Sequence, residues 1–156
     1  MTVKPDTQTA AVKLMVASAK DVTMLSAFLQ DGLIAHHDIL FDKARAEVVM
    51  VVDRYRWEQD AERRERVLMG LRITKVDKML QKNMTSSERQ RGTTIFYNLL
   101  NLAYEQDEEG RGSLVFTFSA GAGLRIQIGE LMMSAADIAP PRPAIATPDH
   151  DDDTRS

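Results

Sequence analysis

The sequence contains no cysteine, which removes a whole group of functional chemistries. Without thiols the chain cannot form disulfides, thiolate nucleophiles, cysteine-ligated zinc sites or iron–sulfur clusters. The absence fits a reducing compartment, and we expect a cytoplasmic protein. Histidine is almost as scarce: His36 and His37 are adjacent, and the third, His150, lies near the C-terminus. Few residues are therefore available to build a catalytic or metal site.

Long hydrophobic runs are also missing. No apolar stretch approaches the roughly 20 residues that a membrane helix needs. The segment Ala17-Ser18-Ala19 has the form of a signal-peptide cleavage site, but Lys13 interrupts the apolar stretch before it, and Asp6 lies where basic residues belong. We therefore expect neither a membrane segment nor secretion.

What remains is an ordinary composition for a soluble globular protein, with 44% hydrophobic and 28% charged residues. The length of 156 residues predicts one domain. We place it at residues 12–138. A flexible N-terminus, residues 1–11, precedes it, and a disordered tail rich in proline and aspartate, residues 139–156, follows it.

One helix is predicted near the start of the domain. Ser18 is a suitable N-cap, and Asp21 can be the acidic partner of a capping box. Apolar residues then recur at helical spacing, which predicts a helix from Ala19 to Asp31. Gly32 can supply the left-handed residue that ends it.

The rest of the domain reads as strands. The expected strands are Val12–Ala17, Leu33–Phe41, Glu47–Trp57, Val67–Met79 with a bulge near Thr74-Lys75, Thr93–Tyr104, and a hairpin from Leu114 to Ile128 that continues to about Ser134. Thr93–Tyr104 also fits a helix face, and we favour the strand. Apolar residues on both faces of Val48–Val52 indicate a strand covered on both sides.

Short connections between successive strands favour antiparallel pairing. The predicted fold is therefore α+β and mostly β: a curved antiparallel sheet or small sandwich of about seven strands, with the N-terminal amphipathic helix packed on it.

The strongest candidate site is the segment from Arg54 to Glu58. Strand alternation puts Arg54, Arg56 and Glu58 on one face, and Tyr55 and Trp57 on the other. Two arginines on one face can bind a carboxylate or phosphate, and the aromatic pair can anchor a partner. The same pattern is also typical of a strand with its aromatic residues inside and its charged residues outside in cross-strand pairs. The candidate binding residues are Arg54, Tyr55, Arg56, Trp57, Glu58 and, on the following strand, Arg72.

Several of these segments resemble a known family. Leu29-Gln30-Asp31, Asp38-Ile39, the Arg54–Glu58 motif and the late hairpin resemble an uncharacterised alphaproteobacterial domain-of-unknown-function family of similar length, with an Arg-aromatic-Arg-Trp-Glu strand motif. The resemblance covers Val12–Ile138 and implies a small soluble cytoplasmic bacterial protein. The family has no assigned activity, substrate or cofactor, so the resemblance implies nothing about mechanism. His36-His37 stands where an aliphatic residue and a glycine are expected, so the resemblance gives that pair no role.

Patterns that mark catalysis are absent from the sequence. Adjacent strand histidines point to opposite faces, so His36 and His37 cannot close on one metal ion. No Gly-x-Ser-x-Gly elbow is present for a serine nucleophile. Gly121-Ala122-Gly123 lies between two strands, which favours a hairpin turn with positive φ at the glycines over a phosphate loop. We predict no catalytic residue, no metal and no cofactor, and lean against an enzyme.

Charge is unevenly distributed along the chain. Residues 54–91 contain eleven Lys and Arg against six Asp and Glu, a net of +5, whereas the whole chain is −3. A basic middle can attract nucleic acid, although no RNA-binding aromatic motif accompanies it.

Three functional hypotheses follow. The first is a non-catalytic cytoplasmic interaction module that binds a protein partner through the Arg/aromatic strand. The alternative is a small enzyme or carrier that binds an anionic metabolite at an arginine-lined pocket. The third is weak nucleic-acid binding through the basic middle, which we expect less than the other two. The sequence does not predict the oligomeric state.

Overall fold

The computed structural model describes residues 11–59, 61–84 and 94–144, and these form one α-helix and eleven strands. All strand pairs are antiparallel and belong to one strongly curved sheet, with the order β1-β10-β5-β4-β2-β7-β8-β9-β6. β3 pairs with β4 and β11 pairs with β5, off this path. The predicted class, mostly β with one N-terminal helix on a curved antiparallel sheet, is confirmed, with more strands than expected.

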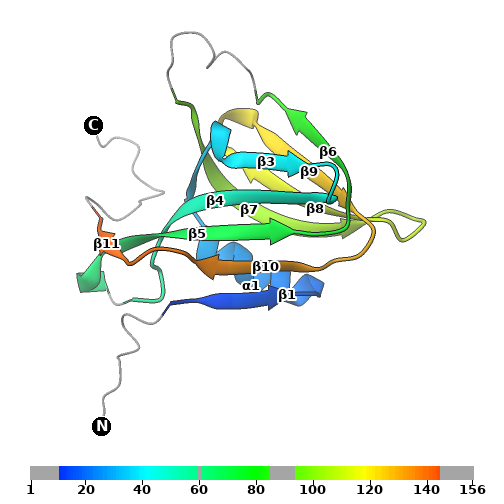
Figure 1. Ribbon diagram of the computed structural model, residues 1–156. Coiled ribbons are helices and arrows are strands. Elements are labelled where there is room, and N and C mark those ends of the chain that lie inside the picture. The colour runs from blue at the N-terminus through cyan, green and yellow to red at the C-terminus, as the bar shows by residue number, and fades with distance from the viewer. Residues whose placement is uncertain (1–10, 60, 85–93, 145–156) are drawn as a thin grey trace.

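The curvature folds the sheet into two layers (Figure 1). The front layer contains β1 (Lys13–Val16), β3 (Ile39–Asp42), β4 (Glu47–Tyr55), β5 (Glu65–Ile73) and β10 (Met133–Asp137). The back layer contains β6 (Val76–Lys82), β7 (Phe96–Gln106), β8 (Gly112–Phe118) and β9 (Gly123–Ile128). β2 (Leu33–Ala35) pairs with both β4 and β7 and so joins the layers, while β11 (Arg142–Pro143) extends the far end of β5.

Helix α1 (Ala19–Leu29) begins at the predicted cap. The backbone N–H of Asp21 donates to Ser18 Oγ at 3.2 Å, and Asp21 Oδ2 accepts from the backbone N–H of Ala17 at 3.0 Å. These hydrogen bonds, the one from Ala17 first, hold the pKa of the Asp21 carboxyl below its usual value. The sequence pattern therefore located the helix start correctly.

The helix ends differently from the prediction. Asp31, with φ 64°, is the left-handed residue, whereas Gly32 has no positive φ. A Cβ at Gly32 would lie 2.5 Å from Val52 Cγ1 and 3.0 Å from the carbonyl oxygen of Leu29. The glycine is therefore needed for the close approach of the chain to β4.

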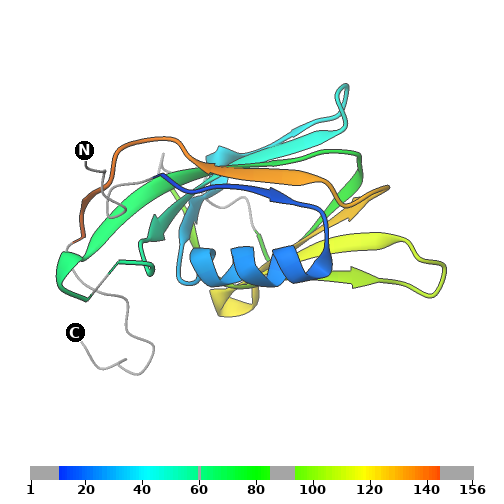
Figure 2. The ribbon, with the colours of Figure 1, turned by 90° about the horizontal axis from the view of Figure 1, so that it is seen from below.

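The core fills the space between the two layers, and α1 lies along the open side between them (Figure 2). The helix is tied to β7, where the backbone N–H of Leu102 donates to Ser26 Oγ at 3.0 Å. Three buried helix residues, Val22, Leu25 and Leu29, belong to one core cluster with the inward-facing residues of both layers, among them Val48, Met50, Val52, Met69, Leu71, Leu114, Phe116, Phe118 and Ile126.

Two corners carry the chain from one layer to the other. The segment Val67–Met79 was expected to be one strand with a bulge, but it turns at Lys75, which has φ 60°, so β5 ends in the front layer and β6 begins in the back layer. The second hairpin strand was expected to reach Ser134. It ends instead at Ile128, and β10 returns to the front layer. Neither corner was predicted, because the apolar residues around each corner favour a strand.

Other segments differ in smaller ways. Thr93–Tyr104 was correctly assigned as a strand, now β7, whereas a 3-10 turn at His36–Asp38 interrupts the expected strand Leu33–Phe41. Within the expected tail, residues 139–156, Arg142 and Pro143 pair with β5 as the strand β11. Residues 145–156 lie outside the described part. Residues 1–10 of the expected flexible N-terminus also lie outside it, as do residues 85–93, between β6 and β7.

The described chain contains no helix that is long and apolar enough to cross a membrane.

Candidate functional site

The arginines of the candidate segment lie inside the protein. Arg54 follows Val48, Met50 and Val52 at strand spacing, so it shares their inward face at the end of β4. It is fully buried, and Arg56, just beyond the strand, is 1% exposed. The expectation that the arginines point outward, opposite to buried aromatics, is therefore wrong.

Arg54 binds two carboxylates in fork geometry. Its Nε and Nη2 donate to Asp137 Oδ1 and Oδ2 at 3.0 and 2.9 Å, while Nη1 and Nη2 donate to Glu58 Oε1 and Oε2 at 2.9 Å each. The guanidinium carbon also lies 5.4 Å from the ring centroid of Phe28 on α1, within the range of a cation–π contact. One side chain thus connects β4, β10 and the helix.

Arg56 extends this network to β5. Its Nη1 donates to Glu65 Oε1 at 2.7 Å, its Nε lies 3.5 Å from Glu58 Oε2, and its backbone N–H donates to the carbonyl of Glu65 at 2.8 Å. Asp137 Oδ2 also accepts from the backbone N–H of Val12, beside β1. We call these five side chains the buried clasp: Arg54, Arg56, Glu58, Glu65 and Asp137.

The electrostatics of the buried clasp favour its charged form. Burial works against the charge on Arg54, but the hydrogen bonds to Glu58 and Asp137 outweigh it and raise the pKa of the guanidinium. Burial likewise works to raise the pKa of Glu58, yet the hydrogen bond from Arg54 and the charges of both arginines leave it below its usual value. Both shifts favour the charged forms of Arg54 and Glu58.

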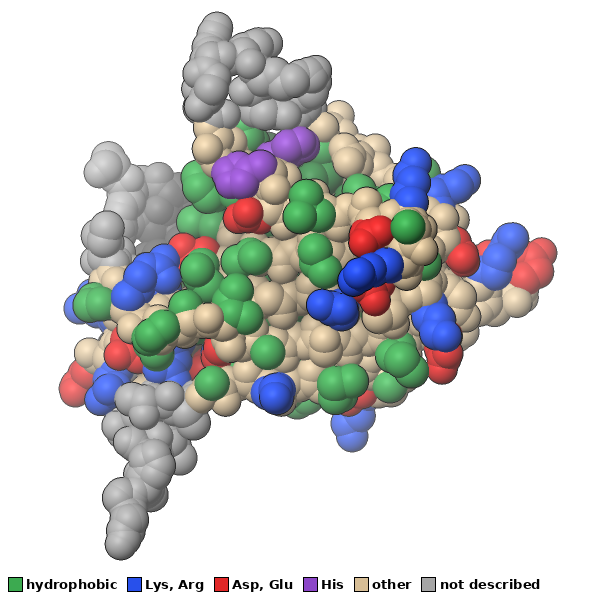
Figure 3. All heavy atoms as spheres, in the orientation of Figure 1, with side chains coloured by type: hydrophobic (Ala, Val, Ile, Leu, Met, Phe, Trp, Pro, Cys, Tyr) green, Lys and Arg blue, Asp and Glu red, His purple; other side chains and the backbone are tan. Residues whose placement is uncertain are grey.

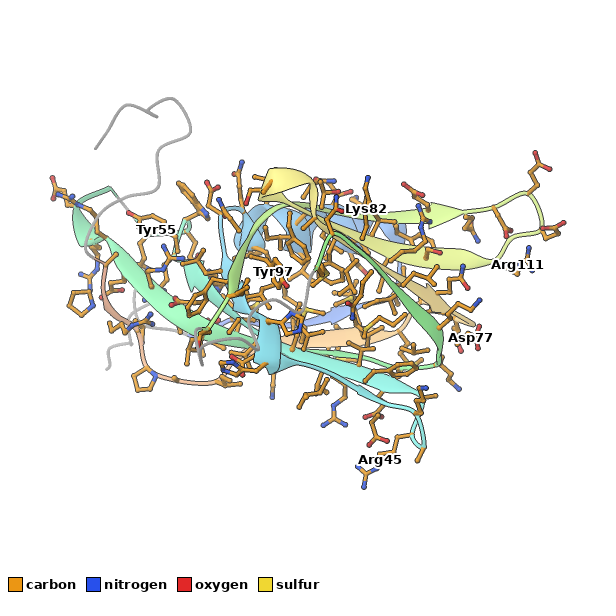
Figure 4. All side chains as sticks on the ribbon, turned by 90° about the horizontal axis from the view of Figure 1, so that it is seen from above. Arg45, Tyr55, Asp77, Lys82, Tyr97 and Arg111 are labelled. Atoms are coloured by element: carbon orange, nitrogen blue, oxygen red, sulfur yellow. The ribbon has the colours of Figure 1, made fainter. Side chains whose placement is uncertain are left out.

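The two aromatic residues of the segment lie together at one end of the molecule, where Figure 4 labels Tyr55. The rings of Tyr55 and Trp57 meet edge to face, with centroids 4.7 Å apart. Tyr55 is buried, whereas Trp57 is half-buried and its Nε1 donates to the carbonyl of Gln30 at 2.9 Å, just after α1. Trp57 thus secures the helix end against the end of β4.

Arg72 does not join the other candidate residues. It pairs with Val49 in the register, five positions along β4 from Arg54, which places it about 17 Å away. Its side chain is on the outer surface, where Nη1 donates to Glu47 Oε1 at 3.2 Å. The structure therefore brings five of the six candidate residues together and separates the sixth.

This arrangement suits structural support better than ligand binding. A hollow of about 510 Å³ beside the buried clasp includes Arg56 and Asp137, with Val67, Ile138 and Pro140 among its apolar lining. The guanidinium of Arg54 is already engaged by two carboxylates of the protein, so an incoming anion would have to displace one of them. No histidine lines this hollow.

His36 and His37 lie elsewhere, at the 3-10 turn between β2 and β3, and His150 is outside the described residues. His36 Nδ1 is 2.7 Å from Tyr97 Oη, and the Tyr97 ring stacks on Phe118 in the core. His37 Nε2 is 3.7 Å from Asp38 on the surface. Within the described ranges, no three His, Asp or Glu side chains converge as a metal site would require.

The basic middle of the chain is divided among separate contacts. Arg54 and Arg56 belong to the buried clasp, and Arg72 binds Glu47. Arg66 donates to Asp53 at 3.1 Å on the outer surface. The described arginines of this segment therefore give no single basic surface, because most of them bind carboxylates from other strands.

The outer face of the front layer carries an open apolar surface that was not predicted from the sequence (Figure 3). Hydrophobic side chains gather over β3, β4, β5 and β10, around a hollow of about 410 Å³. Its lining includes Leu40, Val49, Val51, Gly70, Ala136 and Ile138, and we call these six residues the outer patch. Leu40 and Ile138 are each 57% exposed.

The signal for the outer patch was present but was interpreted differently. Val49 and Val51 alternate with three buried residues of β4, Val48, Met50 and Val52. Apolar residues on both faces of the segment led to the expectation that other elements cover both sides of β4. That expectation is wrong, because no other described element lies over Val49 and Val51 and both remain partly exposed.

Comparison with known proteins identifies a family but no function. No curated protein and no solved structure matches the chain significantly. The family described as "Protein of unknown function (DUF2948)" matches residues 12–150, which is most of the sequence and includes both the buried clasp and the outer patch. The chain therefore belongs to this family of unknown function.

Proposed function

We propose that this protein is a non-catalytic interaction module that binds a folded protein partner through the outer patch. The main support for this proposal is the hollow on the outer face of the front layer. Apolar side chains line this hollow, and no other described element covers it. Clusters of exposed apolar residues rimmed by polar ones are typical of protein-binding surfaces. The expected cytoplasmic bacterial setting is part of this proposal.

The composition of the outer patch supports a folded partner with a broad surface. Gly70 and Ala136 are cross-strand neighbours at its centre, so their small side chains leave the hollow shallow. Leu40 and Ile138 also line it, and Ile138 packs against Gly70. The backbone groups of β4 and β5 are already paired within the sheet, so affinity must come from apolar contact.

The charged residues around the outer patch indicate which charges a partner surface should carry. Asp38 lines the hollow on the β3 side, and Lys13 is exposed on β1 at the opposite side. A fitting partner therefore presents an apolar surface with a basic group facing Asp38 and an acidic group facing Lys13.

The buried clasp fits this function by keeping the binding surface rigid. Asp137 follows Ala136 on β10, and Arg54 lies three residues beyond Val51 on β4, so the Arg54–Asp137 pair fixes the strands that present the outer patch. A surface that is ordered before binding loses less entropy when the partner arrives. The proposed surface therefore lies beside the Arg54–Glu58 segment and depends on it.

A site-specific cross-linking experiment tests this proposal. A photoreactive residue at position 51 should capture a protein in a lysate, whereas the same group at position 103, on the outer face of β7, should not. The captured protein is then purified, and its affinity is measured for Leu40→Glu and for a matched control, Leu100→Glu, which is 45% exposed in the wild type on β7.

Leu40→Glu should weaken binding at least about tenfold, because it introduces a charge into an apolar contact. The control should bind like the wild type. Equal affinity of both variants would refute the outer patch as the binding surface.

A further inference from the structure

We infer that the partner of the outer patch is a second copy of this chain, bound face to face about a two-fold axis that runs along β5. This inference rests on the proposed function and adds the identity of the partner. It is carried by the order of the charged and apolar residues across the five strands of the front layer.

One row of outward-facing residues crosses the whole front layer. Lys13 pairs with Ala136, Ala136 with Gly70, and Gly70 with Val51. Asp38, at the end of the 3-10 turn before β3, lines the same hollow as Val51. The row thus has an acid at one end, a base at the other, and its smallest residue, Gly70, at the centre on β5.

A two-fold axis along β5 exchanges the two ends of this row. It brings Asp38 of one copy over Lys13 of the second copy, and the reverse, so two opposite-charge contacts form. A two-fold axis across the strands would bring Asp38 over Asp38 and Lys13 over Lys13. Like charges brought together across an interface are costly, so the charges select the first arrangement.

The dimensions of packed sheets allow these contacts. β3 and β1 each lie two strand spacings, about 9.6 Å, from β5. Sheets that pack face to face cross at about 30°, which displaces the ends of the row by about 5 Å at a layer spacing of about 10 Å. The four-carbon stem of Lys13 can span such an offset to reach Asp38 of the second copy.

The centre of the row is apolar. Gly70 has no side chain, and Ile138 of the same copy folds over it, since a Cβ there would be 3.3 Å from Ile138 Cγ2. Because Gly70 lies on the axis, the exposed Ile138 side chains of the two copies would meet each other there. The centre of the interface is then an apolar contact between the two hollows.

Arg72 also lies on β5, so the axis brings it near its counterpart in the second copy. Its charge is already matched by Glu47 at 3.2 Å in the same chain. Two such pairs can meet at the axis, whereas two unpaired arginines would repel. The Arg72–Glu47 contact therefore gains a role in the dimer that an isolated surface pair lacks.

The size of the face indicates moderate affinity. Five strands at a spacing of about 4.8 Å, with an average length of about 20 Å, cover roughly 480 Å² in projection. The accessible surface of the side chains is larger than this projection and approaches the roughly 800 Å² per partner of standard interfaces. We therefore expect a dissociation constant in the micromolar range, and measurements should extend from about 1 to about 200 µM.

The test is sedimentation velocity of the full-length chain across that range. The wild type should reach twice the monomer mass of 17.5 kDa. Lys13→Glu and Asp38→Lys should each shift the dissociation constant about tenfold upwards, and the double charge swap should restore it. Leu40→Glu should be monomeric, with Leu100→Glu as the control that dimerises like the wild type.

Each outcome decides something different. A wild type that stays monomeric up to about 200 µM overturns the second-copy inference. The proposed function then still stands if the cross-linked partner binds the wild type and not Leu40→Glu. A dimer that Leu40→Glu leaves intact uses another surface and also overturns the inference. A dimer that Leu40→Glu breaks but the charge swap does not restore overturns the two-fold arrangement along β5.

Discussion

Removal of Arg54 should be among the most damaging single changes in this protein. Arg54→Met keeps an unbranched side chain of comparable length but deletes all hydrogen bonds to Asp137 and Glu58. Asp137 is the more affected partner, because its side chain is only 3% exposed, whereas that of Glu58 is 26% exposed. After the change Asp137 keeps only the hydrogen bond from the backbone N–H of Val12.

The magnitude follows from that imbalance. A buried carboxylate that loses its counter-ion typically costs about 3–5 kcal/mol of folding free energy. Glu58 is partly hydrated and lies near Arg56, so it adds little. We therefore expect Arg54→Met to lower the free energy of unfolding by about 4 kcal/mol at neutral pH.

Urea unfolding, followed by the fluorescence of the single tryptophan, measures this change. Trp57 lies at the end of β4, close to the perturbed site. The double variant Arg54→Met/Asp137→Asn should recover more than half of the loss, because it leaves no unpaired buried charge, while the amide oxygen that replaces the carboxylate can still accept from the backbone N–H of Val12. A double-mutant cycle gives the coupling directly.

The control is a second arginine with two carboxylate partners. Arg111 contacts Asp107 at 2.8 Å and Glu109 at 3.0 Å, but it is exposed at the opposite end of the molecule from Tyr55 (Figure 4). Arg111→Met should leave the urea midpoint nearly unchanged, because water already screens that pair. If Arg54→Met cost less than about 1 kcal/mol, or if its coupling to Asp137 were zero, the argument from burial would be refuted.

Three further predictions concern stability. Gly32→Ala should lose about 1–3 kcal/mol, because its Cβ would meet Val52 and the backbone, whereas Gly129→Ala, whose Cβ would have no neighbour nearer than 3.9 Å, should be nearly neutral in the same urea assay. The pKa of Glu58 in the folded state lies below its ordinary 4.5, so the ionised side chain stabilises the fold above that pH, and this stabilisation is lost as the pH falls through the lowered pKa. A series of urea midpoints at decreasing pH should show this loss in the wild type. The loss should be smaller in Glu58→Gln. Ser18→Ala should cost about 1 kcal/mol in thermal or urea unfolding, because it removes the side chain that caps α1, and an unchanged urea midpoint would contradict this role.

The position of Arg54 shows how much the sequence could predict at the candidate site. Alternation from Val48 through Val52 assigns Arg54 to the inward face, so its burial was accessible from the pattern. Its partner Asp137 was not, because 83 residues separate them. A strand pattern states which face a residue occupies, but only the topology states which distant residue meets it there.

The fold shows the same division between local and distant information. The cap of α1 and the strand β4 depend on neighbouring residues and were predicted closely. The corner at Lys75 was missed because it depends on a positive φ at one lysine, within a segment whose apolar residues favour strand throughout. The outer patch was misinterpreted because a strand with two apolar faces has the same sequence whether or not a second element covers it.

The pairing of β1 with β10 has a consequence for how the chain folds during synthesis. Val12 and Asp137 are 125 residues apart, and the backbones of the two strands around them are hydrogen-bonded in register. At about 5–20 residues per second, a ribosome needs roughly 6–25 s to make the intervening chain. During that interval β1 has no partner strand, and until β7 is made α1 lacks the strand on which it packs most. The most N-terminal of the described strands is thus among the last to be paired, and the nascent protein depends on the solubility of this unpaired strand until β10 arrives.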